Sequence, residues 1–156
     1  MKVLVRVGML LLATGWLGCG GRMPDGLGAD QNSFAACPNK PNCVSSFASD
    51  EDHQIDALAV EGSAEAAWKG LQKLLEDTPR VELVASSDHY IHAVYISSVM
   101  RYRDDVEFLL LRGENEIAVR SASRVGYGDM GVNRNRIEAI RDELSKRGLA
   151  RSSRVD

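Results

Sequence analysis

The sequence predicts one two-layer α+β domain, in which a roughly four-stranded antiparallel sheet is covered by two helices in the order αββββα. The chain has 156 residues, its apolar residues recur with helical period over 64–75 and again over 137–144, and the stretch between them alternates with a period of two. Helices that flank a run of strands pack together on the sheet. This length excludes a multidomain protein, and a hydrophobic content of 44% excludes a disordered chain. The formal net charge of −3 excludes a nucleic-acid binder that relies on a positive field.

Residues 1–18 have the composition of an export signal. Lys2 and Arg6 are followed by the apolar run 8–17, which is shorter than the roughly 20 residues needed to span a bilayer. We therefore expect residues 1–18 to be a signal peptide that contributes nothing to the fold.

Cys19 follows Trp16-Leu17-Gly18, a string that resembles a bacterial lipobox, in which the cysteine is acylated and becomes the mature N-terminus. We expect a lipid on Cys19 to hold the protein in the cell envelope, on the periplasmic face of the outer membrane if the host is Gram-negative. Cleavage without lipidation and an uncleaved anchor are the alternatives. Removing residues 1–18 takes away two basic residues and changes the formal charge to −5, so attachment would depend on the lipid rather than on charge.

Residues 19–36 are rich in glycine and predict a flexible tether after the lipidated cysteine. The remaining cysteines, Cys37 and Cys43, favour a disulfide because an exported protein matures in an oxidising compartment. Pro38 and Pro41 stiffen the loop between them, and closing it stabilises the domain by about 2 kcal/mol. A redox couple or a metal site is less favoured, because five intervening residues fit neither spacing.

Within the single domain, residues 37–148, the elements follow from periodicity. Ser63 caps a predicted helix that ends before Pro79. Its apolar stripe contains Trp68, and we expect it to contact sheet residues such as Phe108 and Ile117. The predicted strands are 81–85, 89–97, 106–111 and 117–121, with a polar crossing at 101–104; the second helix is 134–146, and 149–156 is a frayed tail.

Residues 121–141, SASRVGYGDMGVNRNRIEAIR, are the candidate functional segment. Arginines in the first turn of a helix are disfavoured by about 0.3–1 kcal/mol each, so a partner is required. That partner is either an anionic ligand held at the helix N-terminus or an internal carboxylate, and we favour internal pairing. The residues of this anion site or internal network are Asp104, Asp105, Arg124, Asp129, Asn133 and Arg134, with Arg136 as a further cation.

The sequence contains no complete catalytic or metal-binding constellation. Asp104 and Asp105 are adjacent on an extended chain, so their side chains point to opposite faces and cannot form a dyad. The odd offset between His89 and His92 likewise argues against joint metal ligation. We therefore assign no catalytic residue, no metal and no cofactor.

Three blocks, CPNKPNCVSS at 37–46, DDVEF at 104–108 and the segment at 121–141, together resemble the family known as domain of unknown function 1499. The resemblance covers residues 37–147. It implies an exported or membrane-associated bacterial protein and transfers no catalytic residue.

The leading hypothesis is a non-catalytic, lipid-anchored envelope protein with a structural or ligand-binding role. The first alternative is a small-anion or lipid-headgroup binder centred on Arg124, Asn133 and Arg134. The second is an envelope hydrolase that uses Asp104 or Asp105 as base, which requires a carboxyl pKa well above about 4. The expected partners are a membrane, reached through the lipid, and a small anionic or lipid ligand, but no nucleic acid.

Overall fold

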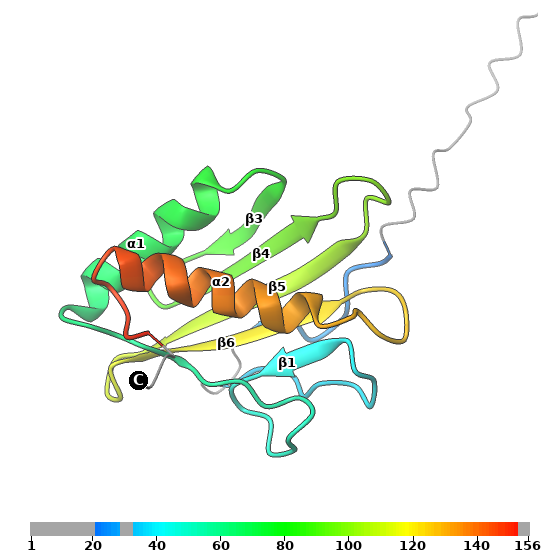
Figure 1. Cartoon of the computed structure of the whole chain (residues 1–156), viewed down its shortest axis with the longest axis horizontal. Helices are drawn as coiled ribbons and strands as arrows, with labels where there is room; N and C mark the ends of the chain where they lie inside the picture. Colours follow the sequence, from blue (N-terminus) through cyan, green and yellow to red (C-terminus); the bar gives the residue numbers. More distant parts are fainter. Residues whose placement is uncertain (1–20, 29–32, 153–156) are drawn as a thin grey trace, which may run out of the picture.

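The computed structural model of the chain describes residues 21–28 and 33–152, so the predicted signal peptide and Cys19 lie outside the described residues. Two helices and one antiparallel sheet confirm the α+β prediction (Figure 1). The helices are α1 (Ala64–Asp77) and α2 (Val132–Lys146). The strands are β1 (Cys43–Ser45), β2 (Leu58–Ala59), β3 (Val81–Ser86), β4 (Tyr90–Ile96), β5 (Arg103–Leu111) and β6 (Glu116–Ser123).

The sheet has six strands rather than four, and two of them precede α1. Its order is β1-β6-β5-β4-β3, and β2 pairs with β6 as well. The predicted four-strand meander is therefore present as β3 to β6, while β1 and β2 both pair along the outer edge of β6. These two strands are only three and two residues long. Segments so short show no measurable alternation, which is why the predicted order αββββα was wrong.

Both helices cover the same face of the sheet (Figure 1). Ser63 caps α1 as predicted, because its Oγ accepts a hydrogen bond from the Ala66 N–H at 3.3 Å. The main core joins the two helix stripes to alternate residues of β4, β5 and β6. It includes Trp68, Leu71, Leu75, Ile91, Val106, Phe108, Ile117, Val119, Ile137, Ile140 and Leu144.

The face of the sheet opposite the helices, here called the far face, is contacted by the N-terminal segment. The Gly28 N–H donates a hydrogen bond to Glu107 Oε1 at 2.9 Å, and Phe34 is buried against Leu109 and Ala118. A side chain at Gly21 would lie only 2.9 Å from the Arg124 Cβ, so the chain is already packed there. Gly21, Gly28 and Phe34 of the expected tether therefore contact the domain.

Leu149 and Ala150, which follow shortly after α2, are also packed. Ala150 is buried and forms an antiparallel bridge with Val60. Leu149 lies on α1, where a side chain at Gly70 would approach its Cδ1 to 2.2 Å. Residues 149 and 150, the first two of the predicted tail, thus complete the core.

Candidate functional site

Asp104 and Asp105 point to opposite faces of β5, as the strand period predicts. Asp104 forms an ion pair with Arg136 of α2, on the helix-covered face. Asp105 pairs instead with Arg124, on the far face. Each carboxylate therefore has its own arginine, and the two do not act as a dyad.

Asp105 is the centre of a buried group on the far face. Arg124 donates from Nε to Oδ2 at 2.9 Å and from Nη2 to Oδ1 at 2.7 Å, while His92 Nε2 lies 2.8 Å from Oδ1. The Asp105 side chain is only 1% exposed. Burial alone would raise the pKa of the Asp105 carboxyl, but the hydrogen bonds from His92 and Arg124 outweigh burial and hold that pKa below its usual value.

A second buried ion pair lies beside the first on the same face. Glu107 Oε2 accepts from Arg120 Nη1 at 3.0 Å, and Glu107 Oε1 accepts from the Tyr90 hydroxyl at 2.8 Å. Burial and the neighbouring Glu107 charge raise the pKa of Tyr90. We call this whole group the far-face cluster: Tyr90, His92, Asp105, Glu107, Arg120 and Arg124.

Asn133 organises the start of α2 and is completely buried. Its Nδ2, which carries two hydrogens, lies within hydrogen-bond distance of three acceptors: the Asn42 carbonyl at 3.0 Å, Ser123 Oγ at 2.9 Å and Asp129 Oδ2 at 2.7 Å. Its Oδ1 accepts from Ser121 Oγ at 2.6 Å. Asn133 thereby connects α2 to β6 and to the residue that precedes β1.

Arg136 joins this arrangement to Asp104. Its Nη1 donates to Ser121 Oγ at 2.9 Å and to Asn133 Oδ1 at 2.6 Å, and its guanidinium lies 4.7 Å from the centre of the Tyr95 ring. Burial raises the pKa of the Tyr95 hydroxyl to about 12, although Arg136 opposes the change. Arg136 is therefore held from three directions.

The N-terminus of α2 is already occupied by a carboxylate of the same chain. Asp129 accepts from the Gly131 N–H at 2.9 Å and from the Asn133 N–H at 2.8 Å. These are the donors that an anionic ligand at a helix start would use. Arg134, expected to contact such a ligand, donates to the Asp52 carbonyl at 3.2 Å instead. The arrangement matches internal pairing rather than an open anion site.

An apolar cavity in the described part of the chain has a volume of about 470 Å³. It lies between the β4–β5 loop and the β6–α2 loop, at the end of the sheet where β5 begins and β6 ends. Tyr102, Val125, Met130 and Val132 supply its apolar walls, and Asp104 lies at its edge, paired with Arg136. The cavity therefore suits an apolar group rather than a charged substrate.

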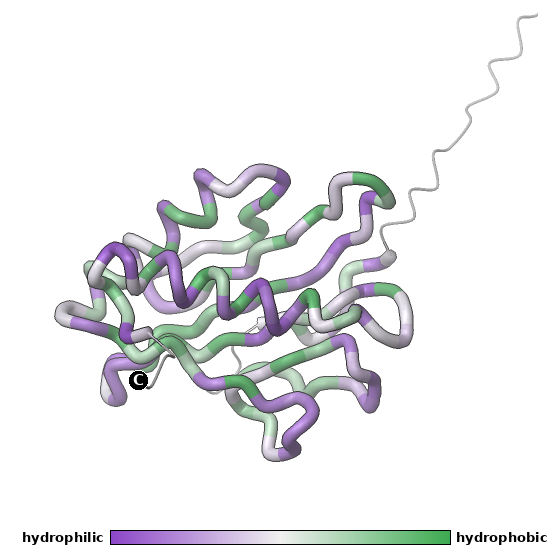
Figure 2. The backbone as a smooth tube through the Cα atoms, viewed as in Figure 1, coloured by the Kyte–Doolittle hydropathy of each residue, from purple (hydrophilic) through white to green (hydrophobic). Residues whose placement is uncertain are grey.

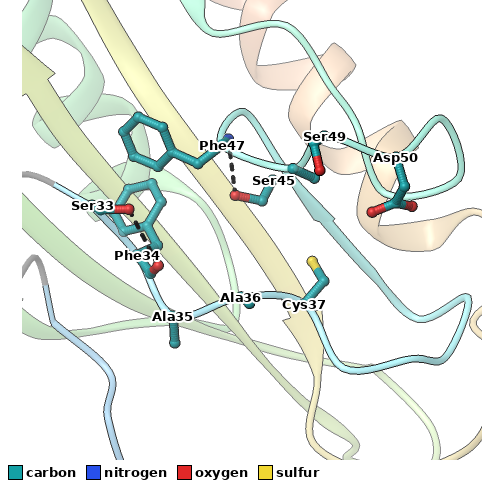
Figure 3. A pocket seen from close by; sticks show the side chains of 10 residues that line it. Ser33, Phe34, Ala35, Ala36, Cys37, Ser45, Phe47, Ser49 and Asp50 are labelled. Atoms are coloured by element: carbon teal, nitrogen blue, oxygen red, sulfur yellow. Dashed lines mark hydrogen bonds between the residues drawn. The ribbon is translucent and has the colours of Figure 1, made fainter.

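A smaller cavity of about 270 Å³ lies beside the Cys37–Cys43 disulfide (Figure 3). The rings of Phe34 and Phe47 lie 5.4 Å apart at one side of it, and the Phe47 N–H donates to Ser45 Oγ at 3.2 Å. The disulfide confirms the sequence prediction. The N-terminal segment itself forms one wall of this cavity, which therefore belongs to the packing of that segment.

Sequence reasoning missed most of the far-face cluster. Glu107 lies two residues after Asp105, so both side chains share one face of β5, and Arg120 is opposite Glu107 in the strand register. This alternation was the available signal. Among residues 21–28 and 33–152, no group of three or more potential ligands could hold a metal ion, and no helix is long and apolar enough to cross a membrane.

A family model described as "Protein of unknown function (DUF1499)" matches residues 33–144. No curated protein and no solved structure matches the chain. The matched range spans more than half of the 156 residues and contains the disulfide, the far-face cluster and the start of α2.

Proposed function

The chain belongs to the DUF1499 family, and we propose that this member is a non-catalytic protein of the cell envelope, anchored to a membrane by a lipid on Cys19. The lipobox-like sequence before Cys19 supports the anchor. The observation that carries the non-catalytic role is the internal pairing of the buried charges. Asp105 and Glu107 each bind an arginine of the same domain and are almost entirely shielded from solvent.

A general base needs access to substrate and a pKa near the working pH. The pKa of Asp105 is lowered rather than raised, and His92, its neighbour, is buried with it. These properties support a structural role for the far-face cluster and count against the hydrolase alternative.

The anion-binding alternative has less support than the structural role. Its donors at the start of α2 are used by Asp129, and Arg124 is used by Asp105. We therefore propose that the domain's exposed binding surface lies at the apolar cavity, where the two loops meet.

The anchor is tested by growing cells that express the full chain with an alkyne-bearing palmitate analogue. We expect the wild-type protein to incorporate the label and to sediment with membranes, and Cys19→Ser to do neither. Unlabelled wild-type protein in the soluble fraction would overturn the proposal.

The non-catalytic role is tested with Asp105→Asn and Asp104→Asn. We expect neither wild type nor variant to turn over envelope lipid or peptidoglycan. Turnover that is lost in a variant of unchanged melting temperature would assign an enzymatic role to that carboxylate.

A further inference from the structure

Exposed apolar side chains are concentrated at one end of the molecule. Of the nine large hydrophobic residues that are exposed in the described part of the chain, six lie in or beside the β4–β5 and β6–α2 loops. We call these six the loop rim: Val99, Met100, Tyr102, Tyr127, Met130 and Val132. The same two loops enclose the 470 Å³ cavity, and Figure 2 shows hydrophobic stretches in both. Monomeric proteins rarely gather exposed apolar groups in this way without a partner.

The backbone of both loops is also unusual. Arg101 and Met130 have φ angles of 57° and 54°, in the left-handed region that residues with side chains seldom adopt. Met130 is 100% exposed, although it borders the 470 Å³ cavity. A fully exposed apolar side chain on a strained residue supports a contact with a partner outside the domain.

The position of Gly21 brings the N-terminal part of the described chain beside the loop rim. Gly21 is packed against Arg124 and Val125, at the start of the β6–α2 loop. Figure 1 shows the beginning of the described chain, in blue, on the same side of the molecule as both loops. Cys19 is two residues away, and because a residue spans at most about 3.6 Å, its Cα lies within roughly 7 Å of Gly21. A lipid on Cys19 would therefore enter the bilayer directly beside the loop rim.

We propose that the loop rim is a membrane-contacting surface, which enters the interfacial layer of the bilayer that holds the Cys19 lipid. The domain then lies directly on the membrane instead of at the end of a tether. This inference depends on the acylation proposed above. Tyr102 and Tyr127 suit the headgroup level, and the methionine and valine side chains suit the acyl boundary. Because the mature chain is acidic, apolar contact rather than charge attraction drives the approach.

The test measures the depth of single positions in the membrane. The full chain, carrying Val99→Cys or Met130→Cys, is labelled with a thiol-reactive NBD fluorophore without reductant and reconstituted into phosphatidylethanolamine–phosphatidylglycerol vesicles. Glu114→Cys is the control, because Glu114 is exposed in the β5–β6 turn, at the opposite end of the sheet. Doxyl-labelled lipids then quench fluorophores that enter the bilayer, and intact mass spectrometry of the same samples reports acylation.

We expect several-fold stronger quenching at positions 99 and 130 than at position 114, in protein whose mass includes acyl chains. Equally weak quenching at all three positions of acylated protein would overturn the membrane contact and leave the anchor intact. A blue-shifted label that doxyl lipids do not quench would assign the rim to a second copy of the chain and also overturn it. A mass without acyl chains would instead overturn the proposed function and remove the premise of this inference.

Discussion

The far-face cluster and the loop rim differ in how they place polar and apolar groups. The far-face cluster buries two carboxylates, two arginines and a histidine, each with a partner from a neighbouring strand or from the loop after β6. The loop rim leaves valine, methionine and tyrosine side chains in solvent. Charged residues in a glycine-rich segment suggest a ligand site, yet here they form ion pairs and hydrogen bonds within the domain. This difference supports the proposal that the exposed apolar side chains, rather than the charged residues, form the contact surface of this protein.

The largest expected effect on stability comes from removing the central carboxylate of the far-face cluster. Asp105→Ala leaves Arg124 and His92 buried without their acceptor, and we expect a loss of about 3–5 kcal/mol in the free energy of unfolding. Urea denaturation of the purified protein measures it. The matched control is Glu82→Ala, which removes another carboxylate–arginine pair, with Arg103, that is largely exposed and should cost at most about 1 kcal/mol. Equal losses in the two variants would show that the buried pair has no special role.

Removing the disulfide is expected to have the next largest effect. Cys37→Ser with Cys43→Ser should lower the free energy of unfolding by about 2 kcal/mol, because the unfolded chain regains the freedom of the closed loop. Reductant should produce the same shift in wild type and none in the double variant. If reductant leaves wild-type denaturation unchanged, the bond does not contribute to stability.

Asp129→Ala tests whether the start of α2 is occupied by an internal carboxylate. Losing the acceptor for the Gly131 and Asn133 N–H groups should cost about 1 kcal/mol. The freed donors should also make the variant more responsive to sulfate than wild type, which is measured by melting temperature against chloride at matched ionic strength. Sulfate-specific stabilisation of wild type that Arg134→Ala abolishes would instead restore the anion-site hypothesis.

Acid is expected to have the smallest effect. The pKa of Asp105 is lower in the folded protein than the usual value of an aspartate carboxyl, because His92 and Arg124 donate hydrogen bonds to it, so its ionised form contributes stability above about pH 4. That contribution is lost as the pH falls through the folded-state pKa. Wild type should therefore lose stability below about pH 4, and Asp105→Asn should show a flatter acid limb. Parallel acid limbs would contradict this role for Asp105.

The regular parts of this fold followed from periodicity, because each pattern was long enough to measure. The stripe containing Trp68, the alternation of β4 and the placement of Asp104 and Asp105 on opposite faces needed only local sequence. The strands β1 and β2 could not be predicted from local sequence, because their pairing with β6 is decided by tertiary contacts. The segment that covers the far face escaped prediction for a similar reason: glycines predict freedom, but the sheet supplies the acceptor for Gly28.

The candidate site was predictable as a set of charges but not as a set of pairs. Sequence adjacency placed Asp104 and Asp105 near several arginines, yet the choice of Arg136 for one and Arg124 for the other depends on where α2 and the end of β6 lie. Arg134, weighted equally with them, donates a hydrogen bond to the Asp52 carbonyl instead. Glu107 was read as part of a strand pattern, and its buried partner Arg120 depended on the register of β5 and β6.

The backbone pairing of residues 149–151 constrains the order in which the domain can fold. The Glu61 N–H donates to the Leu149 carbonyl and the Arg151 N–H to the Ala59 carbonyl, which closes a loop of about ninety residues around both helices. Contacts so distant in sequence form slowly, since the chain must lose much of its freedom before they are made. Folding can therefore be completed only after residue 151 has been synthesised. In shorter nascent chains, the surface of α1 around Gly70, which Leu149 covers in the folded domain, is exposed.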